Sequence, residues 1–258
     1  MTAATPWSHS SRSTCSLLIL ALVILWPGPA AAYRPFNGTD AAVAEKGMFE
    51  LELGPLGYLS QTGERALLAP SLVLNWGVAD GWEVVLEGRH FVHVGGDASE
   101  PRLRVEDTGL FLKGVIREGE LQEKTGVSLA TELGALLPTV NGEAGAGAEW
   151  ALIASRRWAS VTAHLTGAAS YTRAHSLGLF GSTILEGPER WAVRPVGEVF
   201  VEEEGGGAAT FSGLMGAIWR ATDHLSFDGG VRLARTGGAD TVELRAGVTW
   251  GFSVGFPR

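Results

Sequence analysis

Charged side chains in this chain recur at every second residue within stretches that are otherwise apolar. Glu83, Glu87 and Arg89, for example, alternate with Val84 and Leu86. Successive side chains of a β-strand point to opposite faces, so this spacing would gather the charges on one face. Such groups could pair and stiffen an enclosed interior, or they could select among passing solutes, and both interpretations stay open. The candidates for this lumen lining are Glu50, Glu52, Glu83, Glu87, Arg89, Lys113, Glu132, Glu149, Arg194, Glu198, Asp228, Arg232, Glu243 and Arg245.

Residues that could support catalysis or metal binding are too scattered to predict either. His90 and His93 lie near the end of a predicted strand, and no serine or asparagine partner occurs at strand spacing from either. The other histidines beyond residue 32 are His164, His175 and His224, without the spacing of a metal-ligand motif. We therefore predict no catalytic residue, no metal site and no cofactor. With 28 acidic against 20 basic residues, nucleic-acid binding is also disfavoured.

Residues 1–32 have the features of a secretory signal peptide. Arg12 precedes an apolar run over 17–26 that is too short to cross a bilayer as a helix. The alanines at 30–32 supply the small residues of a cleavage site, and an uncleaved N-terminal anchor is the alternative. Cys15, the only cysteine, would leave with this segment, so we expect a mature chain without disulfides.

Residues 33–258 are predicted to form a single domain of short strands. Apolar and polar residues alternate, and neither helical periodicity nor a second long apolar run interrupts them after the extended lead-in at 33–40. The expected strands are 49–53, 72–76, 82–91, 110–117, 127–137, 149–155, 161–172, 177–186, 191–202, 211–219, 225–233 and 241–252. About twelve strands, with roughly ten to fourteen allowed, predict an all-β fold: a transmembrane up-and-down antiparallel β-barrel.

The predicted connections between strands alternate in length. Short periplasmic turns and longer outer loops are typical of membrane barrels. The short connections lie near 77–81, 118–124, 156–158, 187–190 and 221–223, and those that are longer or richer in glycine or acid lie near 54–66, 95–104, 138–147, 173–176, 203–208 and 236–240.

Tryptophans gather beside the short connections. Amphipathic rings favour the membrane–water interface, so we expect them to form a girdle at the periplasmic end of a barrel in the outer membrane. A secreted, soluble ligand-binding barrel of the lipocalin kind would instead keep such rings in its core, and it is the alternative fold. The girdle candidates are Trp76, Trp82, Trp158, Trp191, Trp219 and Trp250.

The last predicted strand closes in aromatic residues. Gly247, Trp250 and Phe252 resemble the C-terminal signal that the barrel-assembly machinery of the outer membrane recognises, although Ser253 to Arg258 follow it here. The expected partners are therefore this machinery, outer-membrane lipid and a small-molecule solute.

Several local motifs resemble a known bacterial outer-membrane family. They are Arg34-Pro35-Phe36, Thr39-Asp40-Ala41, Gly47, Glu50-Leu51-Glu52-Leu53-Gly54, the turn at 75–82, Asp107 with Leu110 and Lys113, Leu137-Pro138-Thr139 and Val196-Gly197-Glu198-Val199. Together they resemble the transporter family associated with the meta-pathway of phenol degradation. The resemblance implies an outer-membrane barrel with a transport role, and it brings no catalytic residues.

The function that these patterns favour is a narrow passive channel for small solutes, including apolar or aromatic ones. About twelve strands enclose a lumen too wide for side chains alone to fill, and inward positions include small residues such as Ser170, Gly230 and Gly247. Acidic residues outnumber basic ones in the predicted lining, so ion flow should mildly favour cations. The alternatives are a non-conducting structural barrel and, with less support, a lipid-modifying enzyme of the outer membrane.

Overall fold

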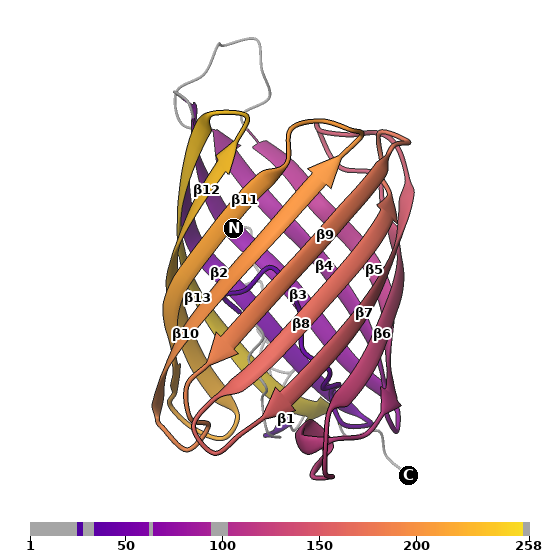
Figure 1. Cartoon of the computed structure of the whole chain (residues 1–258), viewed down its shortest axis with the longest axis vertical. Coiled ribbons are helices and arrows are strands. Elements are labelled where there is room, and N and C mark those ends of the chain that lie inside the picture. The colour runs from indigo at the N-terminus through magenta and orange to yellow at the C-terminus, as the bar shows by residue number, and fades with distance from the viewer. Residues whose placement is uncertain (1–24, 28–33, 62–63, 94–102, 255–258) are drawn as a thin grey trace, which may run out of the picture.

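The computed structural model describes residues 25–27, 34–61, 64–93 and 103–254. Within them, the strands β2 to β13 each pair with their sequence neighbours, and β13 also pairs with β2 to close a barrel (Figure 1). The strands are β2 (Met48–Gln61), β3 (Glu64–Ala79), β4 (Trp82–His93), β5 (Leu103–Arg117), β6 (Ser128–Leu136), β7 (Gly147–Arg157), β8 (Thr162–Tyr171), β9 (Leu177–Glu186), β10 (Val193–Glu204), β11 (Thr210–Arg220), β12 (Leu225–Thr236) and β13 (Ala239–Val254).

All pairings between these twelve strands are antiparallel, which confirms the predicted all-β, up-and-down barrel. Between β5 and β6 lies a single turn of 3-10 helix, η1 (Glu120–Gln122). Among the described residues, no helix is both long and apolar enough to cross a membrane.

The alternation of residue types sorts side chains between the two faces of the barrel wall. Leu165 and Val199 project outward and are exposed, whereas Thr166 and Glu198 on the same strands face inward and are buried. A strand with period-two alternation does this automatically, because successive side chains point to opposite faces. The apolar outer face and polar inner face are the reverse of a soluble barrel.

The first hairpin is longer than predicted. The segment near 54–66 was expected to be a loop, but β2 runs to Gln61 and β3 begins at Glu64. The pairing of β2 with β13 changes register between Leu53 and Leu56, where Gly54 and Pro55 lie. A bulge tolerates proline because its backbone needs no ladder donor there, so Gly-Pro interrupts the alternation without ending the strand.

The two ends of the barrel differ mainly in their aromatic residues. We call the end with the connections at 80–81, 118–127, 158–161, 187–192 and 221–224 the tryptophan end, and the opposite end the loop end. The predicted contrast in length is weak, since 118–127 is as long as 137–146 at the loop end. The six predicted girdle tryptophans are all exposed near the tryptophan end, and Trp150, nearer the loop end, is exposed too.

A short strand, β1 (Leu25–Pro27), pairs with the end of β13. These residues belong to the predicted signal peptide, and the rest of 1–32 lies outside the described residues. Cleavage after this segment therefore stays a prediction.

Residues 34–47, which we call the inner segment, run inside the barrel near the tryptophan end rather than outside it. Phe36 packs against Ile184, Val196, Leu214 and Ile218 on the inner faces of β9, β10 and β11. The burial of these side chains stabilises the segment, as burial of apolar surface does in any core. The predicted lead-in is thus an interior element, and part of the inner wall is apolar to receive it.

Candidate functional site

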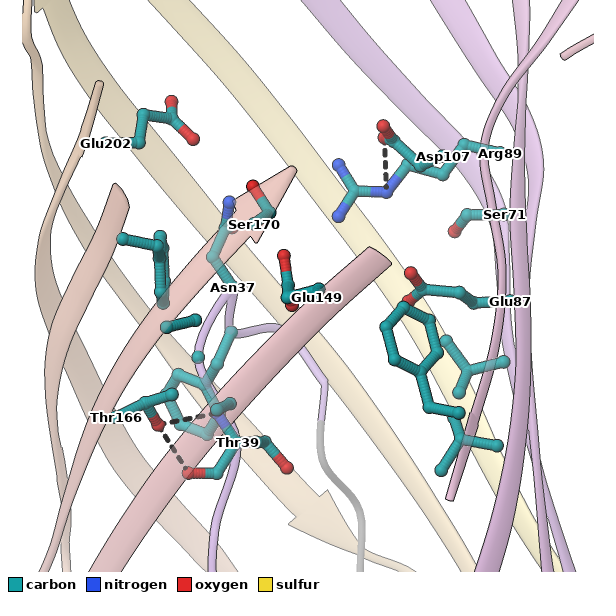
Figure 2. Close-up of a pocket in the computed structure, with 18 of the residues that line it drawn as sticks. Asn37, Thr39, Ser71, Glu87, Arg89, Asp107, Glu149, Thr166, Ser170 and Glu202 are labelled. Carbon is teal, nitrogen blue, oxygen red and sulfur yellow. Dashed lines mark hydrogen bonds and ion pairs between the residues drawn. The ribbon is translucent and has the colours of Figure 1, made fainter. Parts of the chain in front are cut away.

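The interior of the barrel is divided into a filled part and a cavity. The cavity has a volume of about 740 Å³, and its lining runs from Ala44 of the inner segment to Arg173 and Glu204 near the loop end. Figure 2 shows Asn37 and Thr39 on one side of this space, with Glu87, Glu149 and Glu202 projecting from the strands. The inner segment therefore forms the floor of the cavity.

Ten of the fourteen predicted lining residues border this cavity. They are Glu50, Glu52, Glu83, Glu87, Arg89, Lys113, Glu132, Glu149, Arg232 and Glu243. The other four are engaged elsewhere: Glu198 and Asp228 contact the inner segment, Arg194 pairs with Glu186, and Arg245 lines a smaller adjoining space. Whether any of them selects a solute stays a prediction.

Glu198 on β10 is one anchor of the inner segment. Its carboxylate accepts the backbone N–H of Asn37 at 2.8 Å and that of Gly38 at 2.7 Å. Two successive backbone donors on one carboxylate form short, charge-assisted hydrogen bonds. The contact also satisfies backbone groups that would otherwise be buried without a partner.

A second anchor lies across the barrel on β4 and β5. Glu83 accepts the Ala44 N–H at 2.6 Å, and its other oxygen lies 3.2 Å from the Lys113 Nζ. The same ammonium lies 3.6 Å from the Asp40 carboxylate and donates to Thr39 Oγ1 at 3.2 Å. Lys113 therefore holds the segment and the wall together.

The start of the inner segment is held by Arg34. Its guanidinium lies 3.6 Å from Asp228 and donates to Ser71 Oγ at 2.8 Å. A Cβ on Gly247 would collide with both Arg34 and Asp228. Gly247, expected to leave open lumen, instead makes room for this ion pair, because only glycine lets the guanidinium approach the wall so closely.

Sequence reasoning did not predict one series of contacting polar side chains on the inner wall, formed by Ser155, His164 and Glu186. Ser155 on β7 accepts the Ala41 N–H at 2.9 Å and hydrogen-bonds His164 Nδ1 at 2.8 Å, while His164 Nε2 lies 3.4 Å from Glu186. The order of groups is that of a serine–histidine–acid relay. All three side chains are buried and none borders the cavity, so in this state they anchor Ala41. Alternation places each residue inward, but only the strand register brings them together.

Near the loop end, arginines and carboxylates form a compact network. Arg232 lies 3.2 Å from Glu243 and 3.1 Å from Glu202, and Arg245 lies 2.7 Å from Glu243. Arg245 also donates to the Pro35 carbonyl at 2.6 Å. These pairs fit the structural interpretation of the inner charges, since they neutralise one another.

The remaining predicted residues lie on the outer wall or at its edge. Trp250 packs against Phe252, whose ring stacks on Phe49 of β2 at the seam where the barrel closes. His90 donates from Nδ1 to the Pro70 carbonyl, and His93 has no described side chain. Within the described residues, no group of three or more potential ligands could hold a metal ion.

Solved structures share this fold at low sequence identity. The COG4313 outer membrane channel from Pseudomonas putida F1 aligns with a TM-score of 0.61 and 11% identity, covering 82% of this chain and 97% of that one. The KdgM porin in complex with disordered oligogalacturonate aligns with a TM-score of 0.52 and 9% identity, covering 78% and 98%. No family model and no curated protein matches the sequence. The likeness shows a common barrel fold, and the resemblance to the meta-pathway family stays a prediction.

Proposed function

We propose that this protein is an outer-membrane channel for small solutes, closed toward the tryptophan end by its own inner segment. The observation that carries the proposal is the cavity of about 740 Å³ inside a closed barrel, floored by that segment. The fold shared with an outer membrane channel and a porin supports it. A solute would enter at the loop end and pass only when the segment moves.

The orientation follows from the outer wall. Exposed leucine, valine and phenylalanine side chains would face lipid, with the girdle tryptophans at the periplasmic interface. The signal peptide at 1–32 would direct export, and the closing strand would be read by the barrel-assembly machinery. Small solutes, including apolar or aromatic ones, would be the cargo.

The test is conductance of the purified protein in planar bilayers, with the inner segment locked or free. Ala41 N lies 2.9 Å from Ser155 Oγ, so these two positions are where we place an engineered cysteine pair to lock the segment. Cys15 is the only native cysteine and lies in the predicted leader, so the engineered pair would be unique in the mature chain. Oxidised Ala41→Cys/Ser155→Cys should stay closed, and reductant should restore the conductance of the single-cysteine controls.

A non-conducting structural barrel is the second candidate, because the inner segment is anchored on several sides of the wall. Folded protein that shows neither conductance nor solute uptake, with the disulfide reduced as well as oxidised, would favour this alternative and reject the channel.

A further inference from the structure

The cavity holds more acidic side chains than its basic ones neutralise. Arg173 donates to the backbone carbonyls of Leu137 and Thr108, and forms no ion pair in the described part of the chain. The other basic groups of the lining already have carboxylate partners: Arg34 with Asp228, Arg89 with Asp107, Lys113 with Glu83 and Asp40, and Arg232 with Glu202 and Glu243.

Three carboxylates of the cavity lining are attracted by basic groups only at longer range, because those basic groups are engaged elsewhere. Across the described ranges, neither an ion pair nor a hydrogen bond engages Glu87 on β4, Glu132 on β6 or Glu149 on β7, and all three border the cavity. Figure 2 shows Glu87 and Glu149 projecting into this space. Glu132 is the cross-strand neighbour of Lys113, but that ammonium is engaged by Glu83 and Asp40.

An aromatic ring lies between these carboxylates. Phe111 on β5 is opposite Gly134 on β6, which in turn is opposite Glu149. A Cβ on Gly134 or on Gly109 would collide with the Phe111 ring, and the one on Gly109 would also lie 3.2 Å from Glu87 Oε1. The two glycines thus let the ring lie flat against the wall, beside Glu87.

Further apolar surface borders the cavity from β4 and from β9. Phe91 and Phe180 are half-buried and border the same space. The cavity therefore combines acidic side chains that lack a direct ion pair with aromatic surface.

We propose that this wall of the cavity binds small organic cations, in which an ammonium group is attached to an apolar body. The ammonium would be attracted by the unpaired carboxylates and by the face of a nearby ring, and the body would cover apolar surface. An anionic solute would meet like charge in an enclosed site, where repulsion is stronger than in bulk water. The inference rests on the proposed channel and names its solute class.

A metal ion does not fit the same residues. A bound divalent cation needs several oxygen ligands at short distances, and no three carboxylates or histidines of the described residues come close enough together. A larger cation with diffuse charge needs no such convergence. The geometry therefore favours an organic ammonium over calcium or magnesium.

The experiment is titration calorimetry on the folded, detergent-purified protein with three probes of similar size. They are benzyltrimethylammonium, which is cationic, benzyl alcohol, which is neutral, and phenylacetate, which is anionic. Benzyltrimethylammonium should bind most tightly and phenylacetate least. The double variant Glu132→Gln/Glu149→Gln should bind the cation about tenfold or more weakly, since it removes two charges that face the ligand in a site of low dielectric.

The matched control is Glu118→Gln/Glu123→Gln. It removes the same net charge from two exposed residues in the connection at 118–127, outside the cavity. The control should bind the cation as the wild type does. Equal binding to Glu132→Gln/Glu149→Gln and wild type, or tighter binding of phenylacetate, would overturn the inference.

Conductance separates this inference from the function on which it rests. A protein that conducts in bilayers but binds none of the three probes remains a channel and lacks the cation site. The opposite result is a protein that binds benzyltrimethylammonium through Glu132 and Glu149 and fails to conduct with the inner segment free. That result would support the cation site and reject the channel function.

Discussion

Replacing Glu198 by alanine should loosen the inner segment without disturbing the barrel wall. The carboxylate is almost fully buried, at 3% exposure, and accepts the backbone N–H groups of Asn37 and Gly38 at 2.8 and 2.7 Å. Strand pairing of β10 with β9 and β11 uses only backbone groups, so it should survive the substitution. The change therefore acts on the segment more than on the fold.

The expected size of the effect follows from the two hydrogen bonds. Hydrogen bonds to a charged group contribute about 1.5–3 kcal/mol each, so losing both should weaken docking of the segment by about 3 kcal/mol or more. Since about 1.4 kcal/mol is a factor of ten, the undocked population should rise by about a hundredfold. Glu198→Gln keeps one acceptor oxygen and should give an intermediate rise. Phe36 remains in its apolar contacts in both variants, so the segment should open more often without leaving permanently.

Hydrogen exchange followed by mass spectrometry measures this opening directly, and bilayer conductance measures its consequence. Amides of residues 36–44 should exchange about a hundredfold faster in Glu198→Ala, with the strands unchanged. Glu202→Ala is the control, because Glu202 lies on the same strand and face but pairs with Arg232 instead of the segment. Exchange in 36–44 that matches wild type would refute the reasoning, as would equal acceleration in Glu202→Ala.

Three further predictions concern export, assembly and the start of the segment. N-terminal sequencing of the mature protein should begin at Tyr33, and an intact Met1 on the membrane-embedded protein would contradict cleavage. Trp250→Asp should lower the yield of heat-modifiable barrel in outer-membrane fractions relative to Trp250→Phe, because a carboxylate near the lipid interface costs up to about 1 kcal/mol. Gly247→Leu should displace Arg34, whose guanidinium fills that space, and should make residues 34–36 accessible to added protease; unchanged proteolysis would count against this packing.

The wall of the barrel was predictable because the alternation of apolar and polar residues is present within each strand. Alternation at Thr162 to Tyr171 or Leu177 to Glu186 fixes which side chains face inward before any partner strand is known, and both predicted ranges match the strands closely. Within the wall, local periodicity fails where backbone geometry is irregular. Gly54 and Pro55 hide the continuation of β2 through its bulge, and a loop was predicted there instead.

The inner segment could not be predicted in the same way. Its residues show no alternation, and their partners lie far away in sequence: Gly38 meets Glu198, Ala41 meets Ser155, and Arg34 meets Asp228. No local rule places a segment without regular secondary structure inside a barrel. A signal was nevertheless present, because Ile184, Leu214 and Ile218 are apolar at inward positions where a water-filled lumen would favour polar residues.

The inner carboxylates have two different roles, although the alternation pattern alone does not distinguish them. Some bind the inner segment, and others do not. A chain segment that lies inside a barrel brings unpaired backbone N–H groups with it, and these require acceptors from the wall. Glu198 and Glu83 supply them, so neutralising Glu83, although it also borders the cavity, should act mainly by loosening the segment at Ala44. Glu87 has no such contact among the described residues and borders the cavity. Reduced cation preference is therefore expected from Glu87→Gln, and increased opening from Glu83→Gln; a reversal potential that shifts equally in both would show that the two groups are not distinct.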